Sequence, residues 1–130
     1  MDTNTISELS QINQTLIIIA VLLATLVIMH FINVVGNGIN NWRSYRNKLI
    51  NKRSIEMHDR ADYEALEAYL NETLERFPNN PHAVFWMARC QLDSSNLESA
   101  KELFNRLKTL EPSWEDQCVT PFLKEIDEKH

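Results

Sequence analysis

The chain has 130 residues, enough for about one small domain, and carries a formal net charge of −5. With only two glycines and four prolines, the composition favours an all-α fold over a turn-rich β fold. From position 54 onward, sixteen acidic residues stand against eight basic ones. An acidic surface disfavours contact with phosphate backbones, so we expect no nucleic-acid partner.

The first expected element is an apolar helix. The uncharged run Leu16–Val35 is 20 residues long, and about 20 helical residues span a hydrocarbon layer of roughly 30 Å. The preceding segment contains Asp2 and Glu8 but no base, unlike the basic start of a cleaved signal peptide. We therefore predict a short extracytoplasmic N-terminus over 1–13 and a retained transmembrane helix over 14–36.

Three polar residues interrupt the apolar run: Thr25, His30 and Asn33. Polar groups inside a membrane often face another protein rather than lipid. For His30 we favour a simpler interpretation, in which a neutral ring near the cytoplasmic interface reaches toward the head groups.

The basic residues near the span all follow it. Because short flanks rich in Lys and Arg stay cytoplasmic, we expect the N-terminus outside and the C-terminal domain in the cytoplasm of a bacterium, as a single-pass inner-membrane protein. Cys90 and Cys118 form no CxxC motif, and we expect reduced, buried thiols. Gly36 and Gly38 are expected to form a flexible break where the chain leaves the bilayer.

The segment 37–58 is predicted to be a basic amphipathic connector helix, because its apolar residues recur at helical spacing with bases between them. One interpretation lays this helix on an anionic membrane surface. The other packs its apolar stripe against the domain that follows, and both remain open. The residues expected at the membrane surface are Trp42, Arg43, Arg46 and Lys48.

A small helical domain is expected over 59–130. Polar turns and prolines divide it into helical segments at 59–77, 82–92 and 97–110, with Ser95 or Asn96 placed to cap the last of these. A final helical piece over 114–130 has apolar residues on one face, namely Val119, Phe122, Leu123 and Ile126.

Two prolines in this domain define a repeat length. Pro78 and Pro112 lie 34 residues apart, and small residues stand between them at Ala88 and Ala100, where antiparallel helices would cross closely, followed by Phe104. In length and residue kinds this segment resembles a tetratricopeptide repeat. The resemblance implies a small domain of antiparallel helical hairpins with a concave inner surface that binds other proteins.

The match has departures. Val84 stands where the family usually has a bulky aromatic residue, and the aromatic Trp86 comes two positions later. The segment 62–78 resembles the second helix of a preceding repeat with one residue missing, and the connector would be its partner helix. The resemblance therefore covers one complete repeat and a half.

The resemblance implies a contact site on the first helix of the complete repeat. If the family's geometry holds, Phe85, Arg89 and Leu92 line the inner concave surface and bind a partner protein. The alternative is that Phe85 packs against the preceding helix as ordinary core.

Signs of catalysis are missing from the sequence. It contains none of the short motifs that build nucleotide, zinc-protease or serine-hydrolase sites, and its four histidines do not cluster. We expect no catalytic residue, no cofactor, no metal site and no small-molecule substrate. The favoured hypothesis is a membrane-anchored adaptor or accessory subunit of a membrane complex. The alternative is a homo-oligomer that forms a structural scaffold of the membrane.

Overall fold

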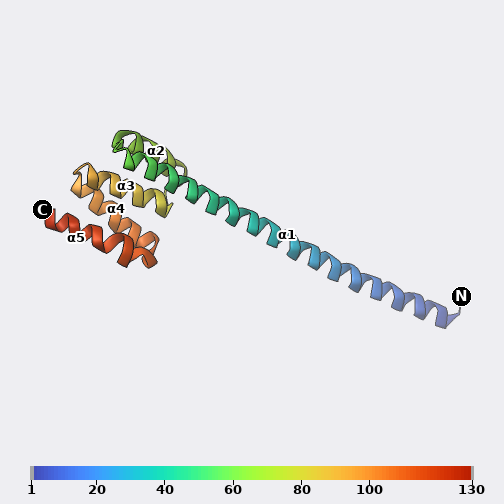
Figure 1. Cartoon of the computed structure of the whole chain (residues 1–130). Helices are drawn as coiled ribbons and strands as arrows, with labels where there is room; N and C mark the ends of the chain where they lie inside the picture. Colours follow the sequence, from blue (N-terminus) through green and yellow to red (C-terminus); the bar gives the residue numbers. More distant parts are fainter. Residues whose placement is uncertain (1, 130) are drawn as a thin grey trace. The chain divides into compact units, whose positions relative to one another are not determined.

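The computed structural model describes residues 2–129, and every regular element within that range is helical (Figure 1). The all-α prediction is confirmed. The chain divides into two compact units, Met1–Ser44 and Tyr45–His130, and each is described by itself below. The elements are α1 (Thr3–Asp59), α2 (Tyr63–Arg76), α3 (Pro81–Asp93), α4 (Leu97–Leu110), the 3-10 turn η1 (Pro112–Trp114), the π-helical turn η2 (Glu115–Val119) and α5 (Thr120–Lys129).

The first unit consists of the N-terminal part of α1 and contains the apolar run. The large apolar side chains of this run are exposed within the chain. Within the described residues, α1 is the one helix whose length and composition would allow it to cross a membrane. A single-pass anchor meets this criterion, and so does a signal sequence near an N-terminus.

The expected flexible break in α1 is wrong. Gly36 and Gly38 both lie inside the helix, which runs without interruption from Thr3 to Asp59. A glycine in a helix interior costs only about 1 kcal/mol relative to alanine. Two such residues within a long run of helical hydrogen bonds do not end the helix.

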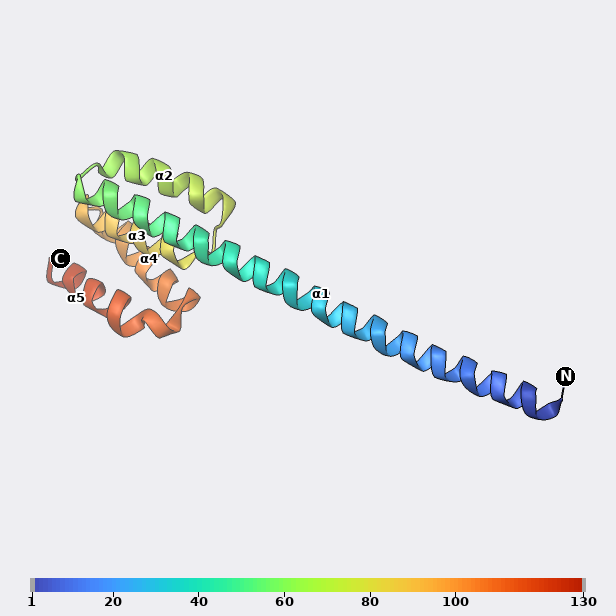
Figure 2. The same ribbon diagram turned by 45° about the vertical axis from the view of Figure 1, so that its right-hand side comes forward.

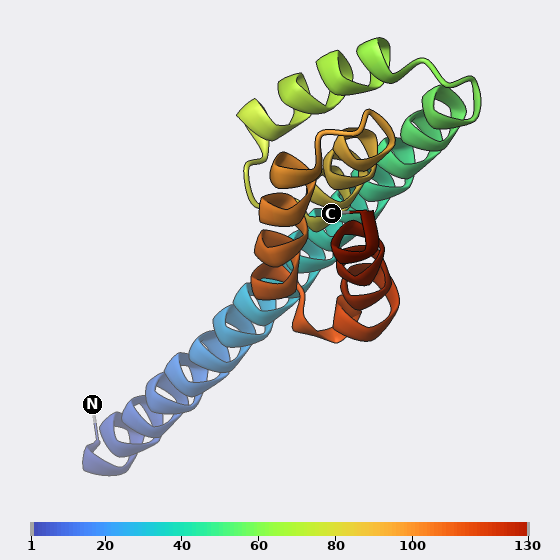
Figure 3. The ribbon, with the colours of Figure 1, turned by 90° about the vertical axis from the view of Figure 1, so that its left-hand side faces the viewer.

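The second unit is built around α3 and α4, which lie side by side as an antiparallel hairpin (Figures 2 and 3). Ala88 and Ala100 are completely buried between them, which agrees with their expected place at a close helix crossing. The first core cluster lies here and comprises Val84, Ala88, Leu92, Ala100, Phe104, Leu107, Val119 and Ile126.

A second core cluster covers the other side of α3. Leu66 and Leu70 of α2 pack there against Ala83, Met87 and Cys90 of α3. The last part of α1 joins this side of the unit: Met57 packs against the cluster, Ile50 is only 3% exposed and Ser54 is completely buried. Of the two interpretations of the connector, the structure has residues 45–59 packed on the helical domain.

Short polar turns separate the helices. The side chain of Asp62 accepts a hydrogen bond from the amide of Ala65, and that of Asn80 accepts one from the amide of Ala83, so both cap helix starts. Asn96 occupies the cap position of α4, but its side chain makes no capping bond and donates instead to Gln91. The turn before it is closed by Ser95, whose φ of 63° is left-handed.

The C-terminal piece folds back on the first cluster. It is divided into η1, η2 and α5 rather than being one regular helix. Its predicted apolar face is correct, because Val119 and Ile126 are completely buried and Phe122 and Leu123 pack against the cluster. The ring of Phe122 stacks on that of Phe104 with centroids 5.0 Å apart.

The packing of α1 on the domain predicts a large difference between two isoleucines of the same helix. Ile50 is 3% exposed and Ile55 is 44% exposed. We expect Ile50→Ala to lower the free energy of unfolding by about 2–5 kcal/mol and Ile55→Ala by much less. Thermal unfolding of each full-length variant in mild detergent, monitored by tryptophan fluorescence, measures the difference in stability. Equal midpoints for the two variants would contradict the packing.

Candidate partner-binding surface

One side of α3 remains partly open after the core has formed. Seven α3 residues are buried in the two clusters or beside them. The open side, here called the α3 stripe, combines aromatic, basic and acidic side chains at one-turn spacing. The α3 stripe consists of His82, Phe85, Trp86, Arg89 and Asp93.

Residues of α1 hold one edge of the α3 stripe. The indole Nε1 of Trp86 donates to Oδ1 of Asn51 at 3.0 Å. Nδ1 of His82 also lies within hydrogen-bonding distance of the Asn51 amide, 3.0 Å from its nitrogen and 3.2 Å from its oxygen. In the last turn of α1, Nε2 of His58 lies 2.5 Å from a carboxylate oxygen of Asp93. These contacts hold the polar side chains of the stripe in place.

Residues from the C-terminal piece form the other edge. The ring of Phe85 meets that of Phe122 edge to face with centroids 5.9 Å apart, and the Arg89 guanidinium lies 4.8 Å from the centre of the same ring. The ring of Trp114 contacts that of His82 at 4.9 Å. The α3 stripe therefore has contacts with α1 along one edge and with η1 and α5 along the other.

The structure brings two of the three predicted contact residues to this surface. Phe85 and Arg89 belong to the α3 stripe, and both are half-buried. The prediction that Leu92 is exposed is wrong, because Leu92 is 3% exposed and belongs to the first core cluster. Seven residues after Phe85, Leu92 is rotated by about 20° in the direction of the core, where α4 and α5 cover it. Phe85 packs against the first core cluster, and its ring lies close to those of Phe104 and Phe122.

Sequence reasoning missed other members of the stripe. His82, Trp86 and Asp93 carry a usable signal, since each lies three or four residues from Phe85 or Arg89 and so shares their helix face. The partners Asn51 and His58 carry none. Their contacts join positions 31 to 35 residues apart in the sequence.

Burial changes the pKa of His82 in the α3 stripe. Desolvation lowers the pKa of His82 below its ordinary value of 6.5, and the nearby charge of Glu111 opposes this shift. The neutral ring is thus the favoured form, which suits its hydrogen bond with the uncharged amide of Asn51.

The residues expected at a membrane surface do not form one group. Trp42 and Arg43 are exposed in the first unit, and Lys48 is exposed in the second. Arg46 differs from the expectation of a membrane-surface residue. Its guanidinium lies 3.9 Å from the centre of the Phe77 ring, so the side chain packs on the helical domain. An apolar ring within reach of a planar cation explains this placement. Arg46 also borders a hollow between α1 and α2, together with Arg53, Arg76 and Glu72.

The loop before α3 is held from two directions. Nδ2 of Asn80 donates to Oδ1 of Asn47 in α1 at 2.9 Å, and the guanidinium of Arg106 in α4 donates to the carbonyl of Pro78 and to Asn79. These bonds fix the start of α3 relative to α1 and α4.

The segment that carries this surface matches a known family. Residues 57–116 match the tetratricopeptide repeat family. This segment is similar to a tetratricopeptide repeat domain. The complete repeat comprises α3 and α4, and α2 supplies the half repeat before it. No curated protein and no solved structure matches the chain. Tetratricopeptide repeats are in general non-catalytic modules for protein–protein interaction, so the family supports a role in binding another protein.

The lowered pKa of His82 gives the repeat domain a predictable response to acid. Below pH 6.5 the unfolded chain binds a proton at this position before the folded domain does, so stability falls as the pH decreases toward the folded-state pKa. We expect His82→Gln, which keeps a hydrogen-bonding group, to make this decline shallower. Unfolding midpoints of both proteins between neutral and mildly acidic pH measure the effect, and parallel curves would contradict it.

Proposed function

We propose that the protein is a membrane-anchored adaptor or accessory subunit, in which residues 14–36 form the anchor and the repeat domain binds a partner protein of a membrane complex. The observation that carries the proposal is the α3 stripe, a partly open surface of aromatic and charged side chains on a tetratricopeptide repeat. The repeat domain would extend over 59–130, with the extracytoplasmic segment over 1–13 and the connector over 37–58.

The membrane part of the proposal rests on the first unit. A run of exposed apolar side chains this long is far larger than the apolar patches of soluble monomers. The segment before it has no base, which disfavours a cleaved signal sequence. The bases after it favour a cytoplasmic repeat domain, and a bacterial inner membrane has the required sidedness.

The partner-binding part rests on the chemistry of the α3 stripe. Trp86 and Arg89 are residue types that often dominate binding energy at protein interfaces. Their neighbours Asn51, His58 and Phe122 already hold them in defined positions, so little side-chain entropy is lost when a partner binds. The surface suits a segment that offers an apolar side chain to the aromatic rings and a carboxylate to Arg89.

Site-specific photo-cross-linking in native membranes tests the adaptor role. A photoreactive residue at position 89 is expected to capture one defined partner protein, while the same residue at Glu102, exposed on α4, is the control. Capture from both positions alike, or from neither, would contradict a binding surface on the α3 stripe. Capture of a second copy of this chain instead would favour the alternative of a self-assembling scaffold.

The proposed orientation makes a separate prediction. In a Cys90→Ala, Cys118→Ala background, a membrane-impermeant maleimide should label Ser7→Cys in intact spheroplasts and Glu102→Cys only after detergent is added. The physical reason is that the bilayer separates the two positions if residues 14–36 span it. The reverse labelling would contradict the orientation, and release of the chain by alkaline carbonate would contradict the anchor.

A further inference from the structure

A regular seam runs along the first unit of α1. Its residues alternate in spacing between three and four, the spacing that keeps side chains facing a partner helix. Its first six residues are apolar and its last four are polar, and all of their side chains are exposed. We call this set the α1 seam, and it consists of Leu9, Ile12, Leu16, Ile19, Leu23, Leu26, His30, Asn33, Asn37 and Asn40.

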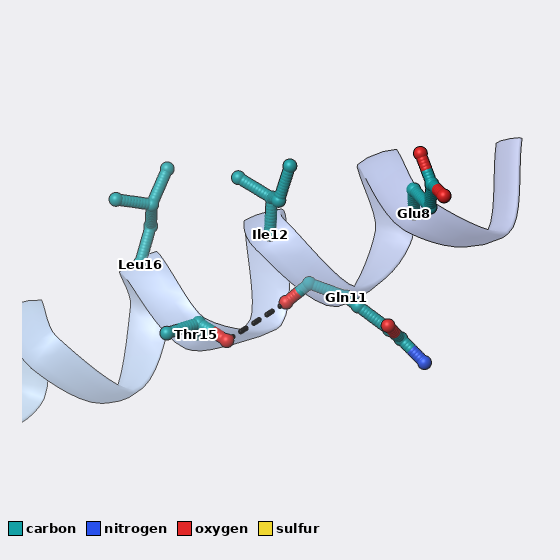
Figure 4. A pocket seen from close by; sticks show the side chains of 5 residues that line it. All are labelled: Glu8, Gln11, Ile12, Thr15 and Leu16. Atoms are coloured by element: carbon teal, nitrogen blue, oxygen red, sulfur yellow. Dashed lines mark hydrogen bonds between the residues drawn. The ribbon is translucent and has the colours of Figure 1, made fainter. Parts of the chain in front are cut away.

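The seam begins before the apolar run. Leu9 and Ile12 are 50% and 56% exposed in a segment that is otherwise rich in Ser, Gln and Asn. Figure 4 shows Ile12 and Leu16 projecting from the same side of the helix, while the Thr15 hydroxyl bonds back to the carbonyl of Gln11. A need to cross a lipid layer does not explain apolar residues that keep this spacing outside the run. A neighbouring helix does.

The polar half of the seam points to the same conclusion. The hydroxyl of Thr25, which lies off the seam, is satisfied by the carbonyl of Val21 at 2.8 Å. Among residues 2–129, the side chains of His30 and Asn33 have no hydrogen-bond partner. The His30 ring can reach toward the head groups, and a partner helix would supply the donors and acceptors that both side chains lack inside the bilayer.

We propose that the α1 seam is covered by the same seam of a second copy of this chain, with both helices parallel. An Asn amide both donates and accepts, so two identical Asn side chains at the same height can bond to each other. The Asn80–Asn47 bond within the repeat domain is a pairing of this kind. Copies with one orientation in a membrane can meet only in parallel, which aligns each seam residue with its equivalent. The inference rests on the anchor in the proposed function.

Cysteine cross-linking in native membranes tests the seam with matched controls. In the background without native cysteines, Ile12→Cys and Asn37→Cys should each form disulfide-linked dimers upon oxidation. Gln14→Cys and Ile39→Cys lie two residues further, on roughly the opposite side of the helix, and should cross-link several-fold less. Equal cross-linking at seam and control positions would overturn the proposal, as would disulfides formed only with another protein.

A second measurement separates the seam from the anchor. Asn33→Leu should raise the dissociation constant of the purified full chain in detergent by about five- to thirtyfold, and Thr25→Leu should leave it unchanged. An equal effect of the two substitutions would overturn the role of the amide. If the wild-type chain is monomeric yet resists carbonate extraction, self-association fails and the anchor stands. If carbonate releases the chain, the anchor itself has failed.

Discussion

Helix α3 is covered on two sides, and the whole repeat domain depends on this double cover. A single helical hairpin cannot bury its apolar faces alone. On one side α4 and α5 bury Ala88 and Leu92, and on the other side α2 and the end of α1 bury Met87 and Cys90. The chain thus stabilises one and a half repeats with two additional helical segments in place of further repeats.

The α3 stripe is the side of α3 that the packing of the other helices does not bury. Asn51 and His58 come from the same helix segment that buries Ile50 and Ser54, so the packing of α1 and the shape of the α3 stripe are coupled. On the opposite edge, Phe122 packs against the first core cluster, and its ring also contacts the guanidinium of Arg89. Side chains that are held in this way lose little freedom when a partner binds.

Helix α1 would serve three purposes in the proposed function. Its apolar run would anchor the chain, its seam would join two copies, and its end completes the repeat domain. Joining two copies would place two α3 stripes on one assembly. Two linked sites bind a partner with two epitopes more strongly than either site does alone, provided that the geometry allows both to engage.

The sequence by itself determined the local features of this protein. Helical periodicity, prolines and polar turns indicated the all-α class, the repeat between Pro78 and Pro112, and the buried face of Val119 and Ile126, because each depends on residues a few positions apart.

Tertiary structure alone decided which faces are covered. Leu92 and Arg89 lie on nearly the same side of α3, and only the positions of α4 and α5 make one core and the other surface. Arg46 resembles its basic neighbours in the sequence until Phe77, 31 residues later, comes within reach of its guanidinium. Such contacts join distant segments, and a local sequence pattern does not show which distant segment will pack against a given side chain.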